Sequence, residues 1–345
     1  MIQTTITGSY ENDLKFFEYL HNGYVNDNTE QRLKVKGALQ AFMRRPAKTL
    51  QRNIEAFQKQ KIQGFSVSTD FSILPRGFYD LVVEETNYDM GWEAAYKLVP
   101  KDKNILTWTI YTAGKAITIK KIPEGGHCEV AEITGEHITA EVDYYGGGLG
   151  WTDKMIRYRE IAAMLDKAAM FRNAFYTAKA NRHYLLLSAA GALNITAFQG
   201  VAADGQLQRD IQTINRCAFD LGNANKDKGY GDTANMPFII YANPDDQSRI
   251  EAAFNVTTTA LAAAGRTGDT VLRRIQRIYT YNSNITARHP LMTLPGWRIQ
   301  RAEDMPPTTY NAPIDVTSLN QIQTVWEIDG AVIADTDQVR QFNLV

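Results

Sequence analysis

The stretch from Asp153 to Ala190 constrains the fold most, because it contains no proline and repeats apolar residues at steps of three and four. This spacing places them in one stripe along an α-helix. The stripe consists of Ile161, Met164, Ala168, Phe171, Phe175, Ala178 and Leu185. Thr152 or Asp153 can cap the start, and Gly191 can end the helix. The sequence predicts one continuous or smoothly curved helix, about 55 Å long, that forms the spine of a domain.

The N-terminal part predicts an arm followed by the first portion of a compact domain. Residues 1–60 are polar, and a helical region is interrupted at Pro46. They hold too few large apolar residues for a core of their own. Residues 65–68 alternate like a strand, whereas residues 79–84 fit either a strand or a short helix.

Residues 101–150 are the most β-like part of the chain. Residues 107–112 are β-branched and aromatic, and residues 116–120 and 138–144 alternate apolar with polar side chains. This pattern predicts a protruding β-hairpin arm. Because an isolated two-stranded hairpin is marginal in water, such an arm needs a partner surface, which favours oligomerisation.

The part after Leu193 predicts a mixed α and β domain. We expect helices over 207–221 and from Pro244 to about Ala264. We expect strands over 237–242, 271–281, 296–299 and 339–345. We also expect a polar loop over 225–232, a proline-rich linker over 305–313 and a hairpin that turns at Asp329-Gly330.

Length and charge narrow the class of protein. A chain of 345 residues favours two domains over one. The 37 basic and 38 acidic residues give a net charge of -1, which argues against a dedicated duplex-DNA binder. The two cysteines form no disulfide framework, no secretory signal is visible, and the best apolar run is half the length of a bilayer span. We therefore expect a soluble, intracellular protein.

The sequence contains few candidates for chemistry. None of the five histidines has metal-ligand spacing, and His127-Cys128 would point to opposite faces of a strand. The glycines of 146–150 lack a complete dinucleotide fingerprint and predict a hinge into the long helix. Asp245-Asp246 fits the first turn of a helix. We expect no catalytic, cofactor or metal site.

The basic residues along the predicted spine leave two alternatives open. They can form a solvated face, or they can pair across subunits. The residues concerned are Arg157, Arg159, Arg172 and Arg182, which lie among Glu160 and Asp166.

The order of these parts resembles the major capsid proteins of tailed bacteriophages, which have the HK-ninety-seven-type shell fold, an α+β class. Three segments carry the resemblance. Residues 122–153 resemble the family's extended loop entering its spine helix, residues 239–244 its axial strand-to-helix step, and residues 326–332 its closing peripheral strands.

The resemblance implies a division of the chain. It comprises an N-terminal arm over 1–61, a peripheral domain beginning over 62–100, an extended β-hairpin loop over 101–150, the spine helix over 151–191, an axial domain over 192–304 with its tip near 225–232, and return strands of the peripheral domain over 305–345.

The resemblance also implies a function. It is a non-enzymatic virion protein that assembles in the host bacterial cytoplasm as hexamers and pentamers of an icosahedral shell around double-stranded DNA. The implied partners are other copies, a separate scaffolding protein, a decoration protein, the portal at one vertex and DNA through weak non-specific contacts, without a membrane. The candidate subunit contacts are Trp108, Tyr111, Lys120, Arg157, Arg159, Glu160, Lys226, Asp227, Lys228 and Tyr230.

Two alternatives remain at this point. One is the shell protein of an encapsulin-type nanocompartment, which shares the fold and would enclose an enzyme. The other is an α/β enzyme with its catalytic domain over Leu193–Asp304, which would need convergent titratable residues in a pocket.

Overall fold

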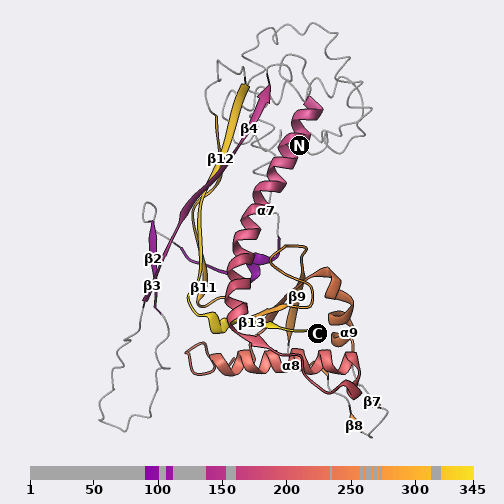
Figure 1. Cartoon of the computed structure of the whole chain (residues 1–345). Coiled ribbons are helices and arrows are strands. Elements are labelled where there is room, and N and C mark those ends of the chain that lie inside the picture. Colours follow the sequence, from indigo (N-terminus) through magenta and orange to yellow (C-terminus); the bar gives the residue numbers. More distant parts are fainter. Residues whose placement is uncertain are drawn as a thin grey trace, which may run out of the picture. The chain divides into compact units, whose positions relative to one another are not determined.

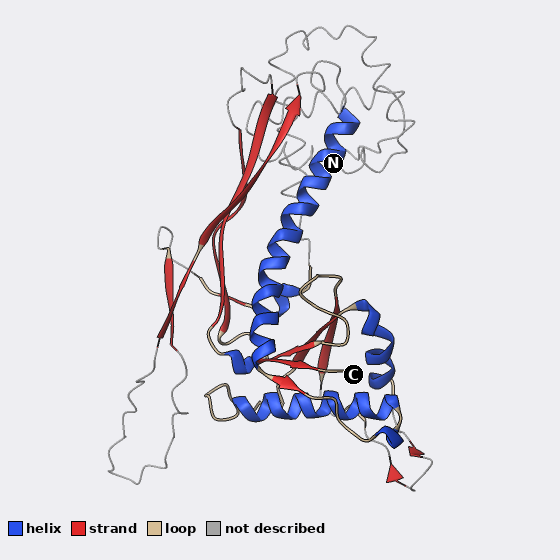
Figure 2. Ribbon diagram, viewed as in Figure 1, coloured by secondary structure: helices blue, strands red, loops and turns tan. Residues whose placement is uncertain are grey.

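The computed structural model is of mixed α+β class (Figures 1 and 2). It describes residues 90–100, 106–111, 137–152, 161–233, 235–256, 260–261, 266–267, 270–271, 274–311 and 320–345. The predictions for residues 1–89, for 116–120 and for His127-Cys128 lie outside this range. The chain divides into two compact units; the first contains Tyr145–Phe175 and Pro307–Glu327, and the second contains Tyr88–Tyr144, Tyr176–Pro306 and Ile328–Val345.

The core of the second unit is a five-stranded sheet in the order β5-β13-β10-β6-β9. Its strands are β5 (Ile195–Thr196), β6 (Phe238–Ala242), β9 (Ile275–Tyr279), β10 (Leu291–Thr293) and β13 (Val339–Phe342). β6 is buried along its whole length, which is why its sequence is continuously apolar. β5 pairs with β13, and β9 pairs with β6, both in parallel.

Helices cover both faces of this sheet. On one face, Phe238 and Ile240 share a buried cluster with α8 (Gln206–Asn225) and α9 (Gln247–Phe254). On the other face, Ile239 and Tyr241 share a cluster with α7 (Ile161–Leu193) and η1 (Trp92–Ala95). Because successive side chains of β6 point to opposite faces of the sheet, β6 contributes to two separate apolar layers of this unit.

α7 confirms the predicted long helix in the described residues, where it is continuous and extends past Gly191 (Figure 1). The expected end at Gly191 was wrong. Gly191 is buried, and a Cβ there would lie 2.6 Å from Leu291 Cδ2, so the glycine permits close helix–sheet packing. Residues 151–152, expected in the helix, belong to a strand.

A four-stranded sheet has the order β1-β11-β12-β4. Its strands are β1 (Lys97–Leu98), β4 (Asp143–Thr152), β11 (Ile299–Asn311) and β12 (Asn320–Ile333). A separate two-stranded sheet pairs β2 (Thr107–Tyr111) with β3 (His137–Glu141) in antiparallel register, as predicted for the arm. β7 (Ala260–Leu261) pairs with β8 (Arg266–Thr267), so the helix expected to reach Ala264 ends at Phe254 instead.

Three segments that the sequence predicts as a hinge, a linker and a hairpin turn lie inside strands in the structure. The glycines of 146–150 lie within β4, where Gly146 leaves room for the Trp326 ring. The expected linker at Pro306 and Pro307 lies within β11, beyond Gln300 and Arg301, with which β1 pairs, so the prolines interrupt none of the β1 pairs. The expected hairpin at Asp329-Gly330 lies within β12.

The expected domain division needs one correction. Residues 339–342 were expected among the return strands of a peripheral domain. The structure places them as β13, between β5 and β10, in the sheet built from residues of the expected axial domain. Val339 and Phe342 are fully buried there, because an interior strand is apolar on both sides.

Candidate assembly interface

The exposed face of α7 carries an apolar row. Met170 is 71% exposed and Leu185 is 57% exposed. Ala174, Ala178, Ala189 and Ala192 are also exposed at helical spacing between or beside them. The predicted stripe was therefore wrong at Ala178 and Leu185. Asn181, which is partly buried and accepts a hydrogen bond from Asn282 Nδ2 at 2.6 Å, lies in the same row between Ala178 and Leu185. The exposed apolar members on either side of it are a candidate contact with another protein.

The buried face of α7 includes polar side chains that the apolar stripe did not contain. Lys179 and His183 are 5% and 2% exposed, and both face Asp329 of β12, which is 1% exposed. Lys179 Nζ lies 3.6 Å, His183 Nε2 3.5 Å and Arg182 Nη2 3.8 Å from Asp329 Oδ2. We call these four residues the charged junction. It joins α7 to β12, and it explains why Asp329 lies in a strand and not in a turn.

Gly330 has a separate reason for its place in β12. A Cβ at this position would collide with the carbonyl oxygen of Glu141, and it would lie 2.9 Å from Val142 Cα. The glycine therefore permits close passage of β12 beside the chain between β3 and β4.

Aromatic rings enclose His183. Trp92 stacks on its ring at a centroid distance of 3.6 Å, and Tyr96 meets it edge-on at 5.2 Å. His183 Nδ1 lies 2.8 Å from the Lys179 carbonyl oxygen, which can only accept, so Nδ1 carries the hydrogen. Burial, assisted by the charges of Lys179, Arg182 and Arg301, lowers the pKa of His183 to about 3, against a hydrogen bond to Lys179 that raises it. The ring is therefore neutral at pH 7.

Burial and the Asp329 charge raise the pKa of Tyr96. Its hydroxyl donates to the His183 carbonyl oxygen at 2.8 Å. Burial likewise raises the pKa of the Cys217 thiol to about 12, so this free cysteine remains protonated and unreactive. These groups therefore belong to the packed interior.

The structure gives Lys228 and Tyr230, predicted as subunit contacts, partners within the chain. Lys228 Nζ lies 2.8 Å from Asp335 Oδ1 and 2.6 Å from Asp337 Oδ2. Burial lowers the pKa of Lys228, but the hydrogen bonds that its ammonium donates to the Asp335 and Asp337 carboxylates, together with their charges, outweigh burial and raise the pKa. Tyr230 is 2% exposed, and its hydroxyl donates to Asp335.

Residues 225–230 therefore hold the segment 335–337, and the structure does not favour a free axial tip there. Asn225 contributes by donating from Nδ2 to the Asp337 carbonyl oxygen at 2.8 Å. Lys226 and Asp227, in the same segment, are exposed.

The remaining predicted contacts separate into buried and undescribed residues. Trp108 is 8% exposed and packs with Ala302 and Ile328, so it belongs to a core and not to an outer contact. Tyr111 ends β2. Lys120, Arg157, Arg159 and Glu160 lie outside the described residues. Of the spine arginines, Arg172 hydrogen-bonds Asn173, whereas Arg182 joins the charged junction.

Asp245 and Asp246 occupy a short helical turn before α9, as expected. Asn243 Oδ1 accepts a hydrogen bond from the Asp245 backbone N–H at 3.0 Å, which caps that turn. Asp246 is fully buried and accepts a hydrogen bond from the Arg288 backbone N–H at 2.6 Å. The two carboxyl groups therefore serve the local fold.

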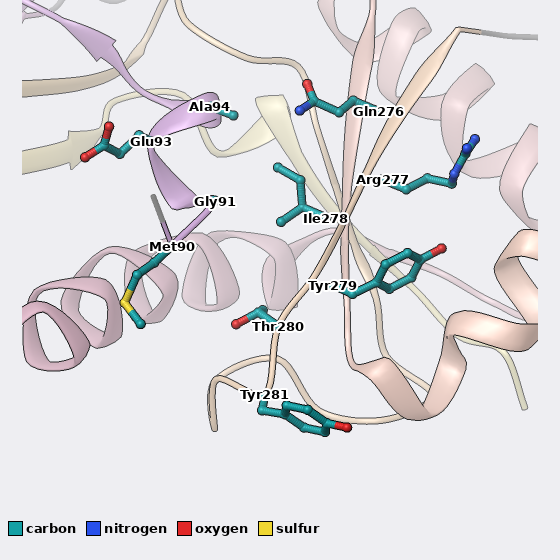
Figure 3. Close-up of a pocket in the computed structure, with 10 residues that line it drawn as sticks. All are labelled: Met90, Gly91, Glu93, Ala94, Gln276, Arg277, Ile278, Tyr279, Thr280 and Tyr281. Atoms are coloured by element: carbon teal, nitrogen blue, oxygen red, sulfur yellow. The ribbon is translucent and has the colours of Figure 1, made fainter. Parts of the chain in front are cut away.

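The described residues contain no group of three or more His, Cys, Asp or Glu side chains placed to hold a metal ion. No helix in the same part of the chain is both long enough and apolar enough to span a membrane. A hollow of about 740 Å³ lies between η1 and β9 (Figure 3). Its carboxylate Glu93 is on η1, while Arg277 on β9 pairs with Glu251 outside the hollow.

No protein-family model matches the sequence, and no curated protein matches it significantly. Among solved structures, the chain is similar to the bacteriophage PhiM1 mature capsid, with 13% identity, 75% of this chain and 88% of that chain covered, and a TM-score of 0.48.

Two further solved structures are similar. The capsid of Myoviridae phage XM1 has 10% identity, coverage of 74% and 91%, and a TM-score of 0.48. A virus-like particle from Pyrococcus furiosus has 8% identity, coverage of 78% and 98%, and a TM-score of 0.45. Because these TM-scores are below 0.5 and the identities are low, the similarity alone assigns no function to this chain.

Proposed function

We propose that this chain is a shell-forming major capsid protein of the HK-ninety-seven type, which assembles from many copies around the double-stranded DNA of a tailed bacteriophage. The observation that carries the proposal is the exposed apolar row of α7. A helix of 33 residues that buries one face and leaves apolar side chains on the other is suited to contact a second copy.

Two further features support self-assembly. One face of the β2–β3 pair packs within the chain through Trp108, while its other face, with Thr109 and Thr139 exposed, is open to a second surface. The nearly balanced charge of -1 limits repulsion among closely packed copies and limits binding to enclosed DNA. Hexamers and pentamers, a separate scaffolding protein, a decoration protein and a portal belong to the same proposal, as do virion location and assembly in the host cytoplasm.

The proposal assigns no enzymatic activity to the chain. The described titratable groups that are buried, such as His183 and Asp329, face one another inside the core and not a substrate-sized hollow. An encapsulin-type shell is the second candidate, because it would use the same contacts between copies but enclose a protein.

Electron microscopy and sedimentation of the purified protein test the proposal. We expect closed shells, or rings of five and six copies, either alone or after addition of a candidate scaffolding protein from the neighbouring genes. Shells that contain DNA when isolated from infected cells support the phage assignment, whereas an enzyme as cargo supports the encapsulin assignment. A monomer under all these conditions would contradict both.

A further inference from the structure

Strand β9 forms one edge of the five-stranded sheet. It pairs in parallel with β6 over five consecutive residue pairs, from Phe238 opposite Ile275 to Ala242 opposite Tyr279. No described strand lies on its other side. This edge is therefore able to accept a further strand.

The register of β9 with β6 fixes which backbone groups of β9 point outward. The Phe238 N–H donates to the Arg274 carbonyl oxygen at 3.2 Å, and the Thr280 N–H donates to the Ala242 carbonyl oxygen at 3.0 Å. In a parallel ladder, every second residue directs both backbone groups to the same neighbour. Arg274 and Thr280 thus face β6, and the N–H and C=O groups of Arg277 and Tyr279 face away from it.

The hollow between η1 and β9 has two walls. Residues 276–281 form one wall, and Met90 with part of η1 forms the other (Figure 3). Two tyrosine hydroxyls hold the second wall: Tyr184 donates to the Met90 carbonyl oxygen at 2.6 Å, and Tyr241 to that of Gly91 at 3.2 Å. The hollow is therefore formed before anything enters it.

Gly91 sets the width of this hollow. Its φ of 79° lies in the left-handed region, and an added Cβ would lie 2.5 Å from Ile278 Cγ2. Figure 3 shows Ile278 directed toward Met90 and Gly91, whereas Arg277 and Tyr279 project to the other side of the strand. One face of β9 is thus packed while its edge stays accessible.

β9 is short and carries the charged Arg277, two features that protect an edge strand, but it lacks others. Its sequence contains no proline and no lysine, and its register with β6 has no bulge. Tyr281, two residues beyond the strand, is 80% exposed. An edge of this kind is a template for pairing, so we expect it to be covered in the functional assembly.

We infer that the outer edge of β9 is a docking site for an extended segment of a second copy of this chain, which adds a strand to the sheet. The inference rests on the proposed shell function. A strand of five residues spans about 17 Å, and it covers far less than the roughly 800 Å² per partner of a stable interface. A free peptide would therefore bind weakly, whereas a copy already held by other shell contacts is present at high effective concentration.

Residue-resolved amide hydrogen exchange tests the inference in assembled shells and in unassembled protein. We expect the amides of Arg277 and Tyr279 to exchange at least about tenfold more slowly in shells. The Thr280 amide, which already bonds Ala242, is the internal control and is protected in both states. Shells without added protection at 277 and 279 would overturn the inference alone, whereas failure to form any shell would overturn the proposed function as well.

Two substitutions at Arg277 give a matched test. Arg277→Ala and Arg277→Pro both remove the 2.9 Å ion pair with Glu251, but only proline also removes the outward N–H. Since this N–H does not face β6, proline is tolerated at such an edge position. We expect shells from Arg277→Ala and at least about tenfold fewer from Arg277→Pro. Equal shell yields would contradict the inference; if Arg277→Pro unfolds, the exchange measurement decides.

Discussion

Asp329 is the residue on which the junction between α7 and β12 depends. Its carboxylate faces Lys179 and Arg182 while only 1% exposed. A buried ion pair adds little over an apolar pair of the same shape, but the loss of one partner is costly. The junction therefore specifies how the helix meets the strand more than it adds to net stability.

Replacing Asp329 by Asn should lower the free energy of unfolding by about 3–5 kcal/mol, because it removes the negative charge that faces Lys179 and Arg182. Urea unfolding measures this change. Asp227→Asn, at an exposed carboxylate, is the control and should change it by less than about 0.5 kcal/mol.

A double variant, Lys179→Met with Asp329→Leu, should recover most of that loss, since it replaces the pair by apolar side chains. A single-variant loss below about 1 kcal/mol would contradict the assigned role of the junction.

His183 should make stability depend on pH. Its pKa is about 3 in the folded chain and 6.5 when unperturbed, so the unfolded chain binds a proton that the folded chain does not over this interval. The free energy of unfolding therefore falls as pH is lowered from 6.5 to 3, by up to about 1.4 kcal/mol per pH unit.

The groups that face His183 are Lys179, Arg182, Asp329, Arg301 and Tyr96. Chemical unfolding of the protein and of His183→Gln across this pH range isolates the histidine contribution. We expect a shallower slope for the variant; parallel curves would show that His183 does not titrate as proposed.

At the scale of elements, α7 packs one face against the core, and its exposed apolar row is the face proposed for assembly. Met170→Lys and Leu185→Lys should each reduce shell formation at least about tenfold, because a charge in an apolar contact is left without water or a partner. Both sites are more than half exposed, so the thermal midpoint should stay unchanged.

Asn173→Lys is the matched control for these substitutions. Asn173 is exposed on α7 but lies away from the apolar row. Electron microscopy counts the shells, and calorimetry checks the fold. Full assembly of both lysine variants in the row would show that this face remains free in the shell.

Apolar periodicity predicted α7 and the buried strand β6, because such patterns follow directly from which faces are covered. It failed where polar side chains are buried. Lys179 and His183 belong to the core face of α7 only because Asp329 lies opposite them, and nothing in the local sequence reveals a partner 150 residues away. The same long-range contact involves Asp329, which lies with Gly330 inside β12, where the local sequence predicts a hairpin turn.

Turn signals failed for a related reason at the two other predicted breaks. Gly146 and Pro306 suit a hinge and a linker locally. In the structure, Gly146 lies in β4 beside the Trp326 ring, and Pro306 lies in β11 beyond the residues that pair with β1. Of the candidate contacts, Lys228 and Tyr230 have partners that the local sequence does not reveal, because Asp335 and Asp337 approach them from another part of the chain. Their contact with another subunit stays a prediction.

At the scale of the whole molecule, the fold depends on its C-terminal segment. Removal of residues 339–345 takes out β13, which lies between β5 and β10, and deletes the buried Val339, Phe342 and Leu344. We expect this truncated protein to be insoluble or unfolded, since three buried apolar side chains at about 2–5 kcal/mol each are comparable with a typical domain stability of about 5–15 kcal/mol. Circular dichroism and sedimentation measure this outcome.

Removal of Val345 alone is the control for that truncation. Val345 is 74% exposed, so its loss should leave the fold intact. A folded, soluble protein without residues 339–345 would show that β13 is dispensable for the sheet.

The position of β13 has a consequence for synthesis on the ribosome. β5, at 195–196, has to wait for residues 341–342 before it gains its neighbour, although most of the sheet has been translated by then. Non-local pairing of this kind makes folding late and cooperative. Prematurely terminated chains therefore lack an interior strand of this sheet, and the cell's proteases can remove them before they enter an assembly in which every copy has to fit.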